Sequence, residues 1–253
     1  MAQITVEYID HMGSDLTTVN AARVSFGKES DWKENPFPGG KCPDCGRKSP
    51  DLSEECLEHM GWREYTLSDR DTKLIKYLAK HKHLSPFGHA FATFRVKAPI
   101  FVARQLVKHQ YLRWNEISRR YVDDDPEFYT PTVWRGRSED KKQGSSGIVQ
   151  VDHYHVFVRD DKSYRVDEVC RQSYKALLDA GVAPEQARMV LPQSTMTEWY
   201  WSGSLDAFAA MCRLRCAPDT QYESRIVADQ ISEVMGDLFP VSWASLMENQ
   251  GTK

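Results

Sequence analysis

The spacing of apolar and polar residues along the chain predicts a protein of mixed helices and strands. Apolar residues alternate with polar ones over residues 3 to 9 and 91 to 97, and β-branched and aromatic residues fill 195 to 201, which predicts three strands. Apolar residues three and four positions apart predict helices instead. In chain order these helices are expected over 18–25, 68–80, 166–180, 184–188 and 204–215, with a last helix after the capping-box pair Thr220 and Glu223. The pattern indicates an α+β fold, a mixed sheet flanked by helices.

Residues 97 to 121 hold the predicted helix around which we expect the rest of the chain to be organised. Pro99 suits the first turn of a helix, because the N–H that proline lacks is not needed there. On this helix Gln105, His109 and Leu112 would share one face. The polar side is rich in amides, histidine and arginine beside an apolar base. A solvated face is the ordinary interpretation of such a side, but this density of reactive groups favours a binding surface.

Between about residues 28 and 66 the periodic pattern is lost among prolines and glycines, which predicts an insertion. Inside it, Cys42 and Cys45 form a CPDCG segment, and Cys56 and His59 repeat the same spacing. Three thiolates and one imidazole satisfy tetrahedral zinc, and a segment this poor in apolar residues would need such a staple to fold. We predict a structural zinc knuckle, with a loop carrying incidental thiols as the alternative.

Composition and charge restrict the class of protein. A chain of 253 residues is long enough for a single domain, residues 1–253, that carries this insertion. Its net charge of −3 argues against a general nucleic-acid coat, whose surface would be basic. No apolar run approaches the roughly 20 residues that cross a bilayer, and the first residues show no charged-then-apolar signal region. We therefore expect a cytoplasmic protein with neither a membrane nor a nucleic-acid partner.

The stretch KHQYLRWNEISRRY, residues 108 to 121, resembles the signature of the flavin-dependent thymidylate synthases. That signature has Arg-His-Arg followed at a fixed interval by a serine, with Asn, Glu, Arg and Tyr at set positions. The matching residues are His109, Asn115, Glu116, Ser118, Arg120 and Tyr121. The resemblance continues in order through NAARVSFGK (20–28), HLSPFGH (83–89), FRVKAPIFVARQ (94–105), EFYTP (127–131), KQGSS (142–146), ARMVLP (187–192) and residues 214–223. It covers nearly the whole chain outside the insertion.

The resemblance implies a methyltransferase that converts dUMP to dTMP at C5. Methylenetetrahydrofolate would be the carbon donor, FAD the redox carrier and NADPH the reductant, in a homotetramer whose flavin sites form between subunits. The residues implied around dUMP are Gln105, Glu116, Ile117, Ser118, Arg120, Arg188 and Arg215. Those implied on the flavin side are His83, Ser85, Lys108, His109, Gln110 and Asn115, joined by Arg113 through the argument below. Among all of these, Ser118, Arg215 and His83 are the catalytic candidates.

The chain departs from the family signature at three positions. Lys108 and Gln110 stand where the family has arginines, and Arg113 stands where it has a serine. On a helix Gln110 and Arg113 would be neighbours, so we expect Arg113 to restore the charge that Gln110 removes. Lys108 keeps its charge but loses bidentate geometry. Two alternatives therefore stay open: a related enzyme that hydroxymethylates or takes another pyrimidine nucleotide, and a nucleic-acid-binding module built on the zinc knuckle.

The zinc knuckle predicts a measurable metal content. Protein purified under reducing conditions should carry about one zinc ion per chain, because a complete set of four ligands holds a structural ion tightly. Elemental analysis should show this content falling in Cys45→Ser and unchanged in Cys170→Ser, which lies outside the insertion. A zinc-free wild-type protein would contradict the prediction.

Overall fold

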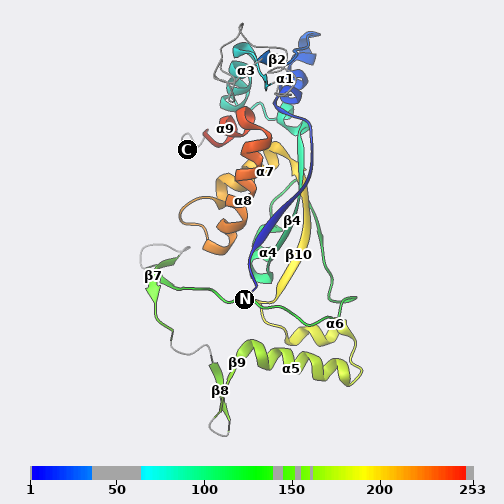
Figure 1. Cartoon of the computed structure of the whole chain (residues 1–253), viewed down its shortest axis with the longest axis vertical. Helices are drawn as coiled ribbons and strands as arrows, with labels where there is room; N and C mark the ends of the chain where they lie inside the picture. Colours follow the sequence, from blue (N-terminus) through cyan, green and yellow to red (C-terminus); the bar gives the residue numbers. More distant parts are fainter. Residues whose placement is uncertain (1, 36–63, 139–144, 152–154, 160–161, 249–253) are drawn as a thin grey trace, which may run out of the picture. The chain divides into compact units, whose positions relative to one another are not determined.

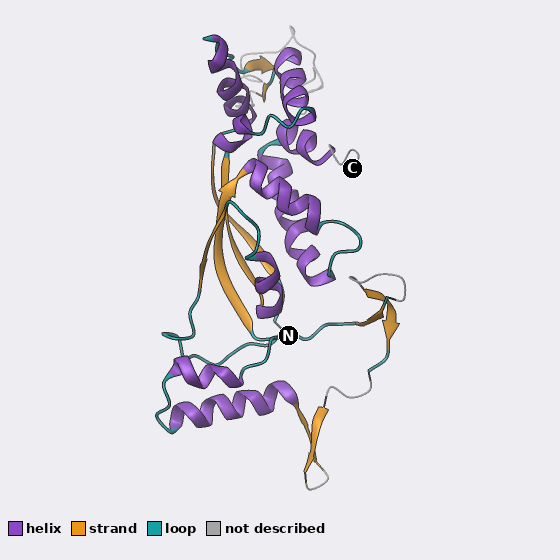
Figure 2. Cartoon of the chain, turned by 180° about the vertical axis from the view of Figure 1, so that it is seen from behind, coloured by secondary structure: helices purple, strands orange, loops and turns teal. Residues whose placement is uncertain are grey.

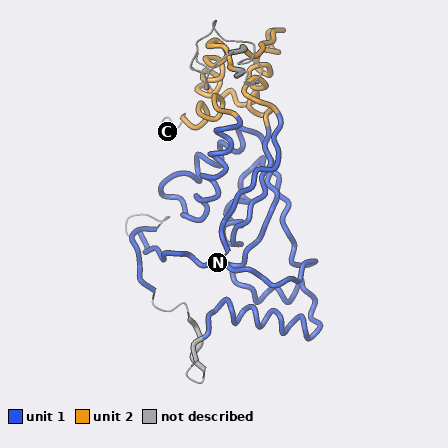
Figure 3. Tube along the Cα trace, viewed as in Figure 1, with its two compact units in different colours: residues 1–12, 91–238 blue, residues 13–90, 239–253 orange. Residues whose placement is uncertain are grey.

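The computed structural model describes residues 2–35, 64–138, 145–151, 155–159 and 162–248. These residues form two compact units (Figure 3). Unit 1 contains residues 1–12 and 91–238, and unit 2 contains residues 13–90 and 239–253. No helix within the described ranges is both long and apolar enough to span a membrane.

Unit 1 is built on a four-stranded antiparallel sheet with the strand order β1-β4-β10-β5 (Figure 1). Strand β10 is central, since it pairs with β4 on one side and with β5 on the other. The bounds of the strands are Thr5–Met12 for β1, Phe91–Pro99 for β4, Met196–Ser204 for β10 and Leu112–Glu116 for β5. The three strands predicted from the sequence are confirmed, with boundaries that differ by a few residues.

Three helices of unit 1 pack on one face of this sheet (Figure 2). They are α4 (Ile100–Leu106), α7 (Leu205–Arg215) and α8 (Tyr222–Leu238). Alternate residues of the strands face these helices, and the ring of Phe208 on α7 lies edge-on to Phe94, with 5.3 Å between centroids, and to Trp201, at 5.7 Å. Burial of these aromatic side chains removes large apolar areas from water and stabilises the layered α+β arrangement.

The long segment between β5 and β10 contains two hairpins and a helical pair. Strand β6 (Trp134–Arg137) pairs with β7 (Ser145–Val149), and β8 (His155–Arg159) pairs with β9 (Lys162–Arg165). Helix α5 (Val166–Asp179), the short helix α6 (Pro184–Ala187) and the 3-10 helix η4 (Arg188–Val190) follow. The helices were predicted, whereas the hairpins were not, because their residues show no sustained alternation.

Unit 2 is mainly helical. Its elements are α1 (Asp15–Arg23), η1 (Val24–Phe26), β2 (Lys33–Asn35), β3 (Glu64–Thr66), α3 (Asp69–Lys80), η3 (Ser85–His89) and α9 (Pro240–Glu248). The buried carboxylate of Asp15 accepts from the backbone N–H groups of Val241 and Ser242, at 2.9 and 2.8 Å, and so holds the start of α9. Strands β2 and β3 pair with each other and lie within the predicted insertion, near its two ends.

Two predictions about local structure are wrong. The helix expected over 97–121 spans only Ile100–Leu106. Residues 112–116 are extended because they pair with β10. Before them, the left-handed backbone of Tyr111, at φ 65°, ends the helical path. Gly203 admits this pairing, since a Cβ there would lie 2.3 Å from the Leu112 side chain. The capping box is also absent: the Thr220 hydroxyl donates to the Leu214 carbonyl, and Glu223 binds Arg135.

Asp71 makes unit 2 sensitive to acid. Burial raises the pKa of its carboxyl, but hydrogen bonds from Ser68, Arg23 and Ser30, with the charge of Arg23, outweigh burial and leave the pKa below its usual value. A lowered pKa contributes stability above the unfolded value of about 3.9 and loses it as pH falls through the folded pKa. Asp71→Asn should therefore lower the free energy of unfolding by about 2 to 3 kcal/mol at pH 7 and by less below pH 4.

Urea denaturation at both pH values measures this difference. Asp69→Asn, an exposed carboxylate at the start of the same helix, is the matched control. Equal stability of wild type and Asp71→Asn at pH 7 would rule out the proposed contribution.

Candidate active site

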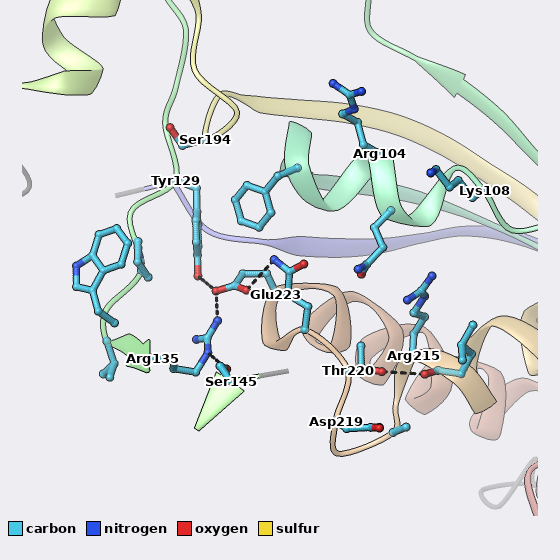
Figure 4. A pocket seen from close by; sticks show the side chains of 18 of the residues that line it. Arg104, Lys108, Tyr129, Arg135, Ser145, Ser194, Arg215, Asp219, Thr220 and Glu223 are labelled. Carbon is cyan, nitrogen blue, oxygen red and sulfur yellow. Dashed lines mark hydrogen bonds and ion pairs between the residues drawn. The ribbon is translucent and has the colours of Figure 1, made fainter. Parts of the chain in front are cut away.

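A cavity of about 1080 Å³ in unit 1 is lined mostly by polar and charged side chains (Figure 4). Its walls come from α4 and the turn after it, the end of α7, the connection into α8, and the hairpin β6–β7. The cationic side chains outnumber the acidic ones. They are Arg104, Lys108, Arg135, Arg213 and Arg215, against Asp219 and Glu223. This excess of positive charge in a concave site favours an anionic ligand such as a phosphate.

Three of the residues implied by the family resemblance line this cavity together. Gln105 comes from α4, Lys108 from the turn that follows, and Arg215 from the last residue of α7. The side-chain oxygens of Gln105 and Ser194, which both line the cavity, are buried without a hydrogen-bond partner among the described residues. Buried polar atoms are nearly always paired, so these two oxygens indicate a ligand or a water that binds there.

His109 and Arg215 form a direct contact that the sequence did not predict. The Nε of Arg215 donates to Nε2 of His109 at 2.9 Å, which requires that this ring nitrogen carries no proton. Burial, followed by the charge of Arg215, lowers the pKa of His109 to about 4. The imidazole is therefore neutral at physiological pH. As the hydrogen-bond acceptor, it orients the guanidinium of Arg215.

The proposed compensation between Gln110 and Arg113 has the wrong geometry. Gln110 lies in the turn before β5, and Arg113 lies on β5 opposite Ser202, so the two are not helical neighbours. Trp114 stacks on Trp199, at 4.2 Å between ring centroids, and the alternation of a strand turns Arg113 to the other face of the sheet. Arg113 does not line the cavity.

The serine and glutamate of the signature lie at the edge strand instead. Glu116 ends β5, where it accepts from the Thr197 hydroxyl at 2.6 Å and from the Trp114 indole N–H at 3.1 Å. Beyond it, Ser118 accepts from Nε of Arg120 at 3.0 Å. These residues, together with the exposed Ile117, form a second group outside the cavity wall.

The remaining predicted residues are placed separately. The exposed Arg188 donates to the Glu185 carbonyl at 3.2 Å, and Asn115 stands on β5 opposite Tyr200. His83 and Ser85 belong to unit 2: the ring of His83 lies edge-on to Tyr77, at 6.1 Å between centroids, and Ser85 begins η3.

Tyr129, Arg135 and Glu223 line the cavity but were not predicted as site residues. Glu223 accepts from Arg135 Nη2 at 2.6 Å and from the Tyr129 hydroxyl at 3.5 Å. Burial and the charge of Glu223 raise the pKa of Tyr129 to about 12, so the phenol keeps its proton. Tyr129 and Glu223 fall in segments that resemble the family, EFYTP and the end of 214–223, which was an available signal. Arg135 lies in a segment without any pattern, and nothing in the sequence indicated it.

The described residues contain no group of three or more histidine, cysteine or acidic side chains placed to hold a metal ion. The predicted zinc ligands Cys42, Cys45, Cys56 and His59 lie outside the described residues, so the zinc knuckle stays a prediction.

Comparison with known proteins agrees with the resemblance seen in the residues. Residues 7–241 match the family model described as thymidylate synthase complementing protein. A flavin-dependent thymidylate synthase of Thermus thermophilus is 36% identical over 244 residues, 96% of this chain and 76% of the relative. That of Kosmotoga olearia is 33% identical over 250 residues, 96% of this chain and 89% of the relative.

Solved structures extend the similarity to three dimensions. A UMP/dUMP methylase, PolB from Streptomyces cacaoi, bound with 5-Br dUMP superposes with a TM-score of 0.69 at 28% identity, covering 98% of this chain and 96% of that one. The same enzyme bound with 5-Br UMP gives a TM-score of 0.70 at 28% identity, covering 98% and 95%. With the family model spanning most of its length, the chain belongs to the flavin-dependent thymidylate synthase family.

Proposed function

We propose that this chain methylates dUMP at C5 to form dTMP, with methylenetetrahydrofolate as carbon donor, FAD as redox carrier and NADPH as reductant. Family membership supports the reaction class. The observation that carries the proposal is the cationic cavity in which Gln105 and Lys108 converge with an Arg215 oriented by His109. Such a site suits a phosphate-bearing nucleotide and a fixed positive charge beside its base.

The donor set fits a flavin dinucleotide. The cavity volume lies just above the roughly 300 to 1,000 Å³ of ordinary ligand sites, the lining is rich in cations, and two of its buried oxygens have no partner among the described residues. FAD, when bound, supplies the redox chemistry that the carbon transfer requires. Following the resemblance, the residues on its side would be His83, Ser85, Lys108, His109, Gln110 and Asn115. Arg113, which the helical argument added to this set, no longer has that support.

Arg215 is the residue that we assign to activation of the base. C5 of uracil is a weak nucleophile, and it becomes more reactive when the pyrimidine is polarised so that electron density shifts from N1 onto C5 and the neighbouring carbonyl oxygen. The fixed guanidinium of Arg215, half-buried at the end of α7, stabilises that shift of electron density in a site of lower dielectric than water. His109 engages Nε, and within the described part of the chain no bond engages the other two guanidinium nitrogens, which would then meet the substrate.

The group at the edge strand leads us to propose an oligomer. Following the resemblance, Glu116, Ile117, Ser118, Arg120 and Arg188 would hold dUMP, yet none of them lines the cavity of its own chain. In a homotetramer with sites between subunits, these residues would complete the cavity of a neighbouring chain. Ser118 would then donate to the nucleotide, with His83 as a further catalytic candidate on the flavin side.

Methylation of UMP is a second candidate activity. The observation that favours it is the similarity over almost the whole chain to an enzyme described as a UMP/dUMP methylase and bound with 5-Br UMP. Lys108 and Gln110 stand where the family has arginines, so hydroxymethylation stays an outcome that the product test must distinguish.

The reaction itself provides the first test. Incubating the protein with FAD, NADPH, methylenetetrahydrofolate and dUMP should give a nucleotide heavier by one methyl group in mass spectrometry. A parallel reaction with UMP tests the second candidate activity, and a reaction without the folate measures the background. A protein without flavin absorbance that returns dUMP unchanged would refute the proposal, and a hydroxymethyl product would replace it.

The low pKa of His109 predicts a specific acid sensitivity. A folded-state pKa of about 4, below the usual value of 6.5, means that the unfolded chain binds this proton first, so stability is lost as pH falls from 6.5 toward 4. His109→Gln should weaken that dependence, because glutamine keeps an acceptor for Arg215 but does not titrate. Urea denaturation from pH 7 to pH 4.5 measures it.

Activity gives the companion measurement for this residue. His109→Leu removes the acceptor and should lower kcat about 10- to 100-fold, while His109→Gln keeps most activity. His89→Gln, an exposed histidine in unit 2, serves as the control for both experiments. An unchanged pH dependence in His109→Gln would show that the buried imidazole is not the titrating group.

A further inference from the structure

The guanidinium of Arg135 makes three contacts at the cavity wall, of which those to Ser145 and Glu223 are drawn in Figure 4. Its Nε donates to the Ser145 hydroxyl at 3.0 Å, and its Nη2 donates to Glu223 at 2.6 Å. Its central carbon lies over the ring of Tyr222, 4.7 Å from the centroid. Arginine normally has many rotamers in solution, so three contacts on one head group indicate a side chain placed in advance.

Glu223 provides the strongest of these contacts. Its side chain is 5% exposed, and a buried carboxylate needs a charged or hydrogen-bonding partner to offset the loss of water. Tyr129 also donates to it, at 3.5 Å, and keeps its own proton because its pKa is raised to about 12. Separating this ion pair would therefore cost much free energy. The pair holds the side chain of Arg135, which belongs to the hairpin β6–β7, in place.

Arg135 nevertheless keeps hydrogen-bonding capacity toward the cavity. Its side chain is 26% exposed, and in the part of the chain that the structure describes no contact engages Nη1. Glu223 neutralises its charge locally, but Lys108 and Arg215 in the same cavity keep the surroundings positive. A planar donor that is already oriented in a cationic site suits the oxygens of a phosphate.

We propose that Arg135 is a phosphate-binding residue of the nucleotide site and that Glu223 is the residue that positions it. This inference rests on the proposed function, since it takes the ligand to be a nucleotide. Two sources of phosphate fit the same chemistry: the monophosphate of the pyrimidine substrate and the diphosphate of the flavin dinucleotide.

Paired ligands with and without phosphate test the proposal. Binding of dUMP and deoxyuridine, and of FAD and riboflavin, is measured by calorimetry or displacement on the wild-type chain and on Arg135→Gln. Loss of charge-assisted bonds should weaken the phosphate-bearing ligand about 10- to 100-fold and leave its phosphate-free counterpart within about 2-fold. The pair that responds identifies the source.

Three further variants separate ligand binding from support of the hairpin. Arg135→Lys keeps the charge without the planar fork and should fall between wild type and Arg135→Gln. Glu223→Gln should lower the preference for phosphate by a smaller factor, through Arg135. Arg137→Gln, on the same strand and outside the cavity, should leave all four ligands unaffected.

The outcomes distinguish this inference from the proposed function. Equal weakening of phosphate-bearing and phosphate-free ligands in Arg135→Gln would make Arg135 a purely structural support and overturn the proposal. Unchanged affinities would overturn it as well. A wild-type chain that binds neither dUMP nor FAD more tightly than their phosphate-free counterparts would remove the nucleotide site itself, and with it both conclusions.

Discussion

The pairing of β10 with two neighbours is the constraint on which the site depends. Trp199 and Trp201 are buried on one face of β10, and Trp114 of β5 stacks against the first of them. For that stack to form, residues 112–116 must be extended, so a helix that begins at Ile100 must end before them. The turn between helix and strand carries Lys108 and His109. Sheet pairing therefore places these two residues near the end of α7, where Arg215 donates to His109 and lines the same cavity as Lys108.

Burial determines which protonation states this arrangement supports. A cation placed next to Arg215 would be repelled, and burial alone already disfavours a charged imidazole, so both effects keep His109 neutral. On the other side of the cavity, a buried carboxylate is balanced by an arginine and a protonated phenol. The cavity thus combines one closed ion pair with an excess of cationic over acidic side chains, and the neutral His109 lies beside it as the acceptor for Arg215. Its net electrostatic preference for anions follows from that excess of positive charge.

Much of the fold was predictable from the sequence, and much of the site was not. Strands β1, β4 and β10 and most helices could be predicted from the sequence because their buried faces are regular, as in Phe94 and Val96 of β4. The prediction for residues 107–116 failed because their local pattern suits a helix, whereas their conformation is decided by a partner strand more than eighty residues away. The same limit applies to the site: Gln105, Lys108 and Arg215 were found through family resemblance, whereas the contact between His109 and Arg215 needed the structure.

The turn after α4 changes how the departures from the family signature at Lys108 and Gln110 are interpreted. On a helix, the charge lost at Gln110 would have to return at Arg113, but the strand turns Arg113 to the opposite face of the sheet from the helices and the cavity. Charge in the cavity comes instead from other elements: Arg104 of α4 and Arg135 of β6 both line it. A positive site can therefore tolerate the loss of arginines from its signature when guanidinium groups from other elements line the same volume. The electrostatic character of this cavity is a property of the assembled wall rather than of one motif.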